Sequence, residues 1–225
     1  MSGTPTLRMT LDLFANTEDA AVGSVPIAPG AVLLHGHARA DAAQLVDAVE
    51  QIAARAPFRH LVTPGGFRMT VAMTNCGELG WVSHRSGYRY DRLDPESGRA
   101  WPPMPPAFRR VAARAAAAAG FEGFVPDACL INRYEPGAKL SLHRDADEPD
   151  GTQPIVSISL GAAATFLFGG AKRTDRATRV ALFHGDVVVW GGPARRHFHG
   201  VLPLKHGDRS PLGDRRINLT FRRAA

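Results

Sequence analysis

Residues 216–222 read RINLTFR, and this alternation of polar and apolar side chains is typical of a β-strand. Because successive side chains of a strand point to opposite faces, Ile217, Leu219 and Phe221 share an apolar face. The other face carries two arginines with an asparagine and a threonine between them. A solvated edge strand would account for the arginines, but it would not require Asn218. We therefore treat the polar face as a candidate ligand-binding surface.

Short β segments with turn residues between them make up the chain from residue 126 onward. They are predicted at 129–134, 140–145, 155–160, 165–168, 180–183, 187–190 and 217–221. This spacing is typical of an antiparallel sandwich or barrel, whereas a doubly wound sheet would need helices between the strands. We expect a mainly β protein with flanking helices, in which residues 126–225 form a double-stranded β-helix core of the jelly-roll type.

Two helices are predicted before this core. The first follows Asp41, an acceptable N-cap, and its apolar residues recur every three or four positions until Pro57. The second begins near Pro106 and stops at Gly120, which suits a helix C-terminus.

The remaining upstream segments are expected to be less regular. Between the two helices, hairpins and long loops are predicted, so residues 31–125 form a region of helices and loops. Residues 1–30 are expected to be an irregular N-terminal segment, because residues 17–30 are rich in alanine, glycine, proline and serine without periodicity.

Composition limits the possible partners and the cellular compartment. The 225 residues are 44% hydrophobic and 21% charged, and no stretch is apolar for long enough to span a membrane. Residues 1–16 lack the regions of a secretory signal. Cys76 and Cys129 form no CxxC pair, so neither a disulfide framework nor a zinc site is expected. We expect a cytoplasmic protein without a membrane partner. The net charge of +6 favours polyanionic partners, although an arginine-rich genome would also produce it.

A metal-binding pattern closes one of the predicted strands. His143 and Asp145 are two residues apart, which places both side chains on one face of a strand. His199 lies far downstream, after further strands have brought the chain round. Two imidazoles and one carboxylate are the ligand set of non-haem Fe(II) oxygenases. Taken alone, an HxD pattern is common, and His143 is then more simply explained as a hydrogen-bonded core histidine.

The two arginines of residues 216–222 separate this oxygenase hypothesis from a zinc hydrolase, which would have no use for them. A dicarboxylate with a keto group suits both them and iron, because a guanidinium binds one carboxylate through two hydrogen bonds while the other end chelates the metal. On a fully extended strand, Arg216 and Arg222 lie about 20 Å apart. Curvature or twist is therefore needed before both can reach one ligand.

Eight segments carry motifs that can be compared with known families. They are PFR (57–59), VTPGG (62–66), VAMTNCG (71–77), PDACLINRY (126–134), PGAKLSLH (136–143), DEPD (147–150), HGDVVVWGG (184–192) and NLTFR (218–222). With these segments the chain resembles the AlkB family of nucleic-acid dealkylases, over nearly its whole length after the N-terminal segment. An HxD pair with a distant histidine and an RxNxTxR strand would rarely occur together in an unrelated fold.

The resemblance implies a cofactor set of Fe(II), 2-oxoglutarate and O2, and it assigns residues to three groups. The Fe(II) ligands would be His143, Asp145 and His199. The 2-oxoglutarate ligands would be Asn132, Tyr134, Arg216, Asn218 and Arg222, with Arg216 on the distal carboxylate. A nucleotide-recognition lid would span about 57–100. The substrate contacts would be Met73, Trp81, His84, Tyr88, Arg89, Tyr90, Asp147 and Arg173.

Some of these substrate contacts have simpler explanations that stay open. Trp81 would also fit as packing within the lid, His84 as a surface histidine, and Asp147 as a turn cap. Arg144, Ala146 and the pair His197–Phe198 depart from the usual pattern of close relatives. These departures leave lesion preference and the balance of DNA against RNA open.

The activity implied by the resemblance is oxidative dealkylation of N-alkylated bases such as 1-methyladenine and 3-methylcytosine. Its products would be formaldehyde, succinate and carbon dioxide. Because a base cannot reach the iron while it is stacked in a duplex, we expect activity on single-stranded DNA, with RNA as a further substrate. We also expect a monomer. Two alternatives stay open: a same-fold oxygenase acting on tRNA, a protein or a small molecule, and a nucleic-acid-binding module without catalysis.

Overall fold

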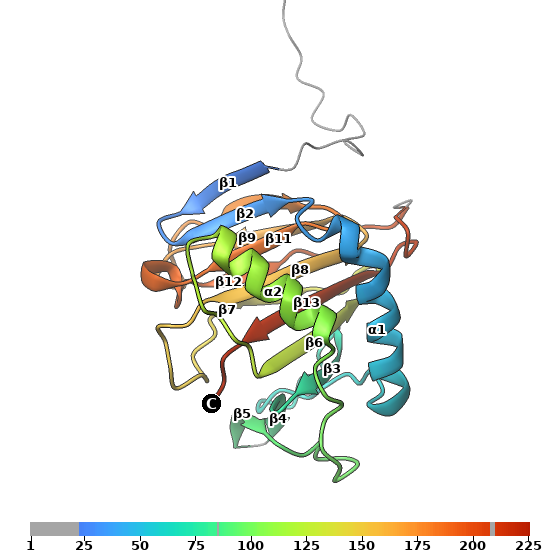
Figure 1. The fold of residues 1–225 in the computed structure, drawn as a ribbon. Helices are drawn as coiled ribbons and strands as arrows, with labels where there is room; N and C mark the ends of the chain where they lie inside the picture. The colour runs from blue at the N-terminus through green and yellow to red at the C-terminus, as the bar shows by residue number, and fades with distance from the viewer. Residues whose placement is uncertain (1–22, 85, 208–209) are drawn as a thin grey trace, which may run out of the picture.

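The computed structural model describes residues 23–84, 86–207 and 210–225. In this part of the chain two β-sheets face each other, and helices cover the outer face of the larger sheet (Figure 1). The prediction of a mainly β protein with flanking helices is confirmed. Among the described residues, no helix has the length and apolar character needed to cross a membrane.

The larger sheet contains seven antiparallel strands within the described residues. In spatial order they are β1 (Gly23–Ala28), β2 (Ala31–His35), β11 (Val187–Trp190), β8 (Ile155–Gly161), β13 (Arg216–Arg222), β6 (Ala128–Tyr134) and β3 (Ala72–Gly77). Strand β13 is therefore interior to the sheet, paired with β8 on one edge and with β6 on the other. This position excludes a solvated edge strand for RINLTFR, because every residue of β13 is buried.

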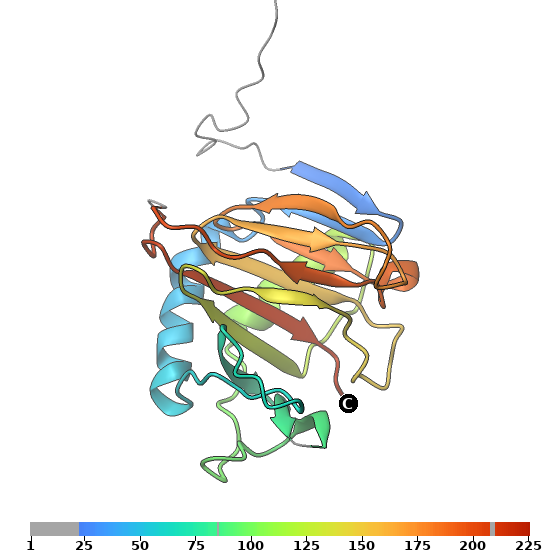
Figure 2. The same cartoon turned by 180° about the vertical axis from the view of Figure 1, so that it is seen from behind.

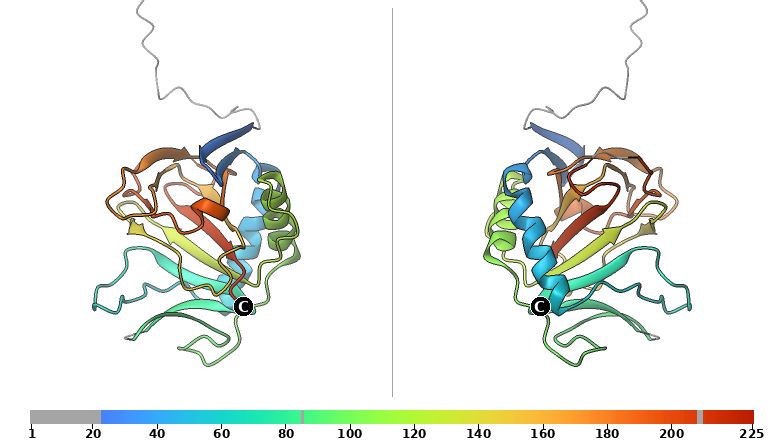
Figure 3. Two further views of the ribbon diagram at one scale, coloured as in Figure 1. Left: turned by 90° about the vertical axis from the view of Figure 1, so that its left-hand side faces the viewer. Right: turned by 90° about the vertical axis from the view of Figure 1, so that its right-hand side faces the viewer.

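The smaller sheet lies behind the larger one in Figure 1 and faces the viewer in Figure 2. Its strands, in spatial order, are β10 (Thr178–Leu182), β9 (Ala164–Phe168), β12 (His199–Val201) and β7 (Leu140–His143). A separate hairpin consists of β4 (Gly80–His84) and β5 (Gly87–Asp91). The hairpin follows β3 and stands on the side of the larger sheet away from the helices (Figure 3).

Helices α1 (Ala42–Arg55) and α2 (Pro106–Ala118) match the two predicted helices. Asp41 precedes α1 as expected, but its side chain does not cap that helix. Its carboxylate instead accepts hydrogen bonds from Arg110 at 3.2 Å and from Arg114 at 2.7 Å, both on α2. The predicted N-cap therefore ties the two helices together.

Alternation along the strands divides the apolar side chains between two layers. On the outer face, Leu219 and Phe221 of β13 pack with Phe108 of α2. On the inner face, Trp190 of β11 packs with Phe166 of the facing sheet. Each central strand thus contributes to both layers, which fixes the register of β13 and the direction in which its arginines point.

Two strands at the start of the described chain correct the sequence-based expectations. Residues 23–28 were expected to be irregular, but they form β1 by pairing with β2. Most side chains of β1 are exposed, so the segment lacks the apolar alternation that would have indicated a strand. Residues 1–22 of the same predicted segment lie outside the described residues. Strand β2, which was not predicted, is an interior strand of the larger sheet.

The end of β7 corrects a further expectation. Strand β7 stops at His143, so Asp145 and Asp147 belong to the following loop rather than to a continuing strand. Strand periodicity therefore does not explain why these carboxylates share a side with His143. Strand β12, which carries His199, was also missed because it is only three residues long.

We expect truncation of the outer layer to destabilise the whole fold. Leu219 is completely buried on β13 beneath the helices. Replacing it with alanine should lower the free energy of unfolding by roughly 2–5 kcal/mol, because the transfer energy is lost and a cavity remains. Urea denaturation followed by circular dichroism measures this change. Val125, which is 62% exposed, provides the control, and Val125→Ala should shift the same free energy by less than about 0.5 kcal/mol.

Candidate metal and cosubstrate site

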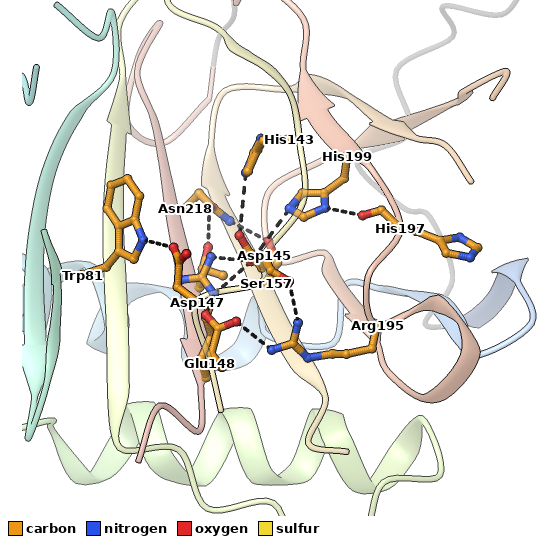
Figure 4. A network of polar contacts seen from close by, with 12 residues as sticks. Trp81, His143, Asp145, Asp147, Glu148, Ser157, Arg195, His197, His199 and Asn218 are labelled. Atoms are coloured by element: carbon orange, nitrogen blue, oxygen red, sulfur yellow. Dashed lines mark hydrogen bonds and ion pairs between the residues drawn. The ribbon is translucent and has the colours of Figure 1, made fainter. Parts of the chain in front are cut away.

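Strand pairing brings the predicted metal ligands together. His199 on β12 lies directly opposite His143 on β7, and their ring centroids are 4.4 Å apart. The carboxylate of Asp145 enters from the loop after β7, with its two oxygens each 3.9 Å from the Nε2 atom of one histidine (Figure 4). One ligand atom from each residue lies within 4.8 Å of the others. This is the arrangement of two imidazoles and one carboxylate that suits Fe(II).

Backbone carbonyls orient both imidazoles. The Nδ1 atom of His143 donates to the carbonyl of Ser141 at 2.9 Å, and Nδ1 of His199 donates to the carbonyl of His197 at 3.0 Å. Because a carbonyl only accepts, the proton of each neutral ring is placed on Nδ1 and the lone pair on Nε2. Burial lowers the pKa of His199 to about 4. Its imidazole is therefore neutral at pH 7, which is the form that binds a metal.

Asp145 is held as a carboxylate by the charge beside it. Burial alone would raise its pKa, but Arg222 and the two histidines outweigh this effect and place the pKa below the usual range. Arg222 donates from Nε and Nη2 to one oxygen of Asp145, at 2.9 and 2.6 Å. The ligand is thus ionised and fixed before any metal binds.

Arg216 presents a different environment on the same face of β13. Its side chain is 1% exposed, donates from Nη2 to Ser159 Oγ at 2.8 Å, and lies with its guanidinium carbon 5.0 Å from the ring centroid of Tyr134. The Nε and Nη1 atoms are buried and have no hydrogen-bond partner among the described residues. Burial lowers the pKa of this guanidinium because the charged form loses its contact with water. An anionic ligand would offset this cost. A carboxylate of 2-oxoglutarate fits these unsatisfied donors.

A row of polar side chains crosses three strands between the two arginines. Asn218 of β13 lies in register with Asn132 of β6 and Ser159 of β8. Asn132 Nδ2 donates to Asn218 Oδ1 at 3.2 Å, and Asn218 Nδ2 donates to Ser157 Oγ at 2.8 Å. The Oδ1 atom of Asn132 is buried without a partner among the described residues. This row leaves polar capacity for a ligand that lies along β13.

A cavity of about 560 Å³ joins these features. Its wall includes the three predicted metal ligands and the five predicted 2-oxoglutarate ligands. The predicted substrate residues that also line it are Met73, Trp81, Tyr88 and Asp147. The structure therefore brings twelve of the predicted site residues to one space, at the inner face of the larger sheet.

Four predicted substrate residues lie elsewhere. His84 is exposed and hydrogen-bonds Ser86 through Nδ1 at 2.9 Å. Arg89 pairs with Asp91 at 3.0 Å on the same strand. Arg173 is exposed in the loop between β9 and β10. Tyr90 is mostly buried, and its hydroxyl donates to Glu148 at 2.5 Å. None of the four lines the cavity, so substrate contact by these residues stays a prediction.

Several residues of the site were not predicted from the sequence. Ser157 and Ser159 are polar residues two apart in the otherwise apolar strand β8, so their alternation could have indicated a polar inner face. Glu148 and Arg195 belong to loops, where no periodicity predicts burial. Only the folded arrangement shows that their side chains form an ion pair at 2.9 Å.

Comparison with known proteins gives the family. Residues 30–222 match the model of the 2OG-Fe(II) oxygenase superfamily. The chain is 56% identical to the alpha-ketoglutarate-dependent dioxygenase AlkB of Escherichia coli over 214 residues, which cover 95% of this chain and 98% of that protein. The chain belongs to the AlkB family of 2OG-Fe(II) oxygenases. It is therefore an Fe(II)- and 2-oxoglutarate-dependent dioxygenase, as the sequence predicted.

Two further matches are less similar in sequence. The solved structure of OsALKBH1 superposes with a TM-score of 0.80 at 29% identity, and the match covers 89% of this chain and 100% of that one. The nucleic acid dioxygenase ALKBH1 of Mus musculus is 33% identical over 136 residues, which cover 59% of this chain and 35% of that protein. The structural match to OsALKBH1 and the family model confirm the predicted jelly-roll core.

The residues of this chain divide the work of an AlkB-family oxygenase. Bound iron and 2-oxoglutarate supply the oxidising chemistry, with O2 as the oxidant. His143, Asp145 and His199 would hold the metal, and Arg216 with Asn132 and Asn218 would hold the cosubstrate. Trp190 and Phe166 belong to the apolar inner layer and line the cavity beside His199, where they limit contact with bulk water.

Arg216 should set the affinity for 2-oxoglutarate. Arg216→Lys keeps the charge but loses the planar fork that binds a carboxylate through two hydrogen bonds. The 2-oxoglutarate concentration for half-maximal succinate formation should rise about tenfold or more. Titration of 2-oxoglutarate against succinate release measures this. An unchanged titration curve for the lysine variant would exclude the assigned role.

Proposed function

We propose that this AlkB-family dioxygenase removes alkyl groups from ring nitrogens of bases in single-stranded DNA, with RNA as a second substrate. The observation that carries this proposal is an aromatic pair on the β4–β5 hairpin at the wall of the cavity that contains the metal ligands. The mouse relative is named as a nucleic acid dioxygenase, which supports the same class of substrate. The AlkB match itself supports dealkylation chemistry.

The aromatic pair consists of Trp81 on β4 and Tyr88 on β5. Their rings are stacked, with centroids 4.8 Å apart and planes inclined by 22°. Asn75 on β3 fixes the backbone of Trp81 through two hydrogen bonds, at 3.0 and 3.1 Å. A flipped base can stack on such a platform whatever its sequence, and stacking is worth roughly 1–3 kcal/mol per base. Met73, also in the cavity wall, would contact the same base.

Basic side chains around the same cavity suit a phosphate backbone. Arg68, Lys139 and Arg144 line it, and the chain has a net charge of +6. Cations placed beside a single-stranded backbone provide affinity without reading sequence. This arrangement favours a nucleic acid over a neutral small molecule. The complete metal triad and the unsatisfied Arg216 favour an enzyme over a binding module that lacks catalysis.

The central test is formaldehyde release from a methylated oligonucleotide. A single-stranded DNA containing 3-methylcytosine should yield formaldehyde and succinate in a one-to-one ratio, only when Fe(II) and 2-oxoglutarate are present. Asp145→Ala removes the carboxylate ligand and should abolish the release. If the wild-type protein forms succinate with a methylated peptide but not with the oligonucleotide, the proposed substrate class is wrong.

Asp147 should favour substrates that carry a positive charge. Its carboxylate lines the cavity and accepts a hydrogen bond from Trp81 Nε1 at 2.9 Å, which places it beside the aromatic pair. Bases such as 3-methylcytosine are cationic, whereas ethenoadenine is largely neutral near pH 7.

Asp147→Asn retains a side-chain oxygen for Trp81 but removes the charge. Because Asp147 is exposed, the weaker, water-like Coulomb energy of about 1 kcal/mol applies, and 3-methylcytosine repair should slow roughly fivefold relative to ethenoadenine repair. Paired single-turnover assays on both substrates measure the ratio. Equal slowing on both substrates would leave Asp147 with a purely structural role in its loop.

We further propose that the protein acts as a monomer in the cytoplasm. Cys76 on β3 and Cys129 on β6 lie opposite each other in register, and both are free thiols. Such a pair is most compatible with a reducing compartment.

A further inference from the structure

Glu148 is a buried carboxylate near Asp145, and it is not one of the three predicted metal ligands. Its side chain is 2% exposed. One oxygen accepts the hydroxyl of Tyr90 at 2.5 Å and lies 3.3 Å from Arg222 Nε, and the other accepts Arg195 Nη2 at 2.9 Å. Both oxygens have protein partners, the side chain is buried, and Glu148 is not among the residues that line the cavity, so its contacts are with the protein.

Arg195 links Glu148 to the loop that carries Asp145. Its side chain is 5% exposed. Arg195 comes directly after the short helix η2 (Gly192–Ala194) and four residues before His199 in the sequence. Besides Glu148, it donates to the backbone carbonyl of Asp145 at 3.1 Å (Figure 4). It also donates to the backbone carbonyl of Gln153 at 2.9 Å. The loop from residue 144 to residue 154 is therefore fixed at both ends by one guanidinium.

Arg222 forms a second link from Glu148 to Asp145. It contacts both carboxylates, at 2.6 Å for Asp145 and 3.3 Å for Glu148. Two carboxylates and two guanidiniums thus form a charge-balanced cluster, and the Tyr90 hydroxyl joins it from the β4–β5 hairpin. Each member loses a partner if another is neutralised, so the cluster behaves as one unit.

We propose that Glu148 is a positioning residue that fixes the metal ligand Asp145 and, through Tyr90, the hairpin that carries Trp81. Tyr90 then acts through Glu148 rather than by touching the base. The role of Glu148 in placing the hairpin, the hairpin half of this inference, rests on the proposed function. Its role in fixing Asp145, the metal half, rests only on the contacts of Asp145.

The expected effect on metal binding follows from the charge balance. In Glu148→Gln, Arg195 loses its carboxylate partner, and Arg222 keeps only the carboxylate of Asp145. The attraction of Arg222 for Asp145 then competes more strongly with the metal for the same oxygens. Tyr90→Phe leaves all four charges in place and removes only the hydrogen bond to the hairpin. The two variants should therefore separate metal positioning from hairpin positioning.

Two binding measurements on the full chain test the proposal. Co(II) titration followed by visible absorbance reports the metal site without turnover. Fluorescence anisotropy with a 3-methylcytosine oligonucleotide reports the hairpin. Glu148→Gln should raise the Kd for Co(II) about tenfold and the Kd for the oligonucleotide by a similar factor. Tyr90→Phe should raise only the oligonucleotide Kd, by roughly fivefold, and leave the Co(II) Kd within about twofold of wild type.

The double variant decides whether Tyr90 acts through Glu148. If it does, Glu148→Gln with Tyr90→Phe should bind the oligonucleotide no more weakly than Glu148→Gln alone, because both changes disrupt one contact. Fully additive losses would show that Tyr90 touches the substrate directly and would overturn the proposal. Glu50→Gln, an exposed substitution on α1, is the control and should match wild type in both titrations.

Three further outcomes would contradict the proposal or the function on which part of it rests. A Glu148→Gln variant that folds, by its melting curve, and binds Co(II) as wild type does overturns the metal half. Should that variant fail to fold, Tyr90→Phe still tests the hairpin half, and an unchanged oligonucleotide Kd contradicts it. If wild-type protein does not distinguish methylated from unmethylated oligonucleotide, the proposed function fails, while the Co(II) titration still tests the metal half.

Discussion

Two guanidinium groups buried on the inner face of β13 are the constraint on which the rest of the site depends. A charge removed from water costs several kcal/mol unless a counter-charge or hydrogen bonds compensate it. Arg222 is compensated within the protein by Asp145 and Glu148. Arg216 has only Ser159 and the ring of Tyr134, and two of its nitrogens remain without a partner among the described residues. The first arginine therefore orders the predicted metal ligand Asp145, and the second has buried donors that an anionic ligand would satisfy.

These different partners explain how two arginines that are far apart on one strand can belong to one site. A straight strand holds residues i and i+6 about 20 Å apart, which is too far for both to bind one carboxylate. In the structure they have different partners along one cavity, so strong curvature is not needed. A dicarboxylate suits this geometry because its two ends can lie at different points along β13, with Asn132 and Asn218 between them.

The β4–β5 hairpin is attached in a different way from the strands of the sandwich. Central strands are held by two apolar layers. The hairpin combines apolar packing of Val82 and Trp81 with specific polar contacts of Trp81 with Asn75 and Asp147, and of Tyr90 with Glu148. Such contacts depend on a few atoms and change with single substitutions. Single substitutions at these contacts are therefore expected to shift the hairpin without disturbing the apolar layers of the sandwich.

The sequence by itself determined the parts of the protein that rest on periodicity and on motif chemistry. Strict alternation in RINLTFR predicted the strand and its cationic face, and the 3.6-residue spacing of apolar residues predicted the first helix. Pro106 and Gly120 predicted the bounds of the second helix, and the HxD pattern with His199 predicted the metal ligands. Tertiary structure alone decided what lies across from what. It made β13 an interior strand, placed His199 opposite His143, ended β7 before Asp145, and buried Glu148 with Arg195 and Tyr90. The physical reason is that side-chain periodicity is a local property, whereas cross-strand register and the pairing of buried charges in loops depend on residues far apart in the chain.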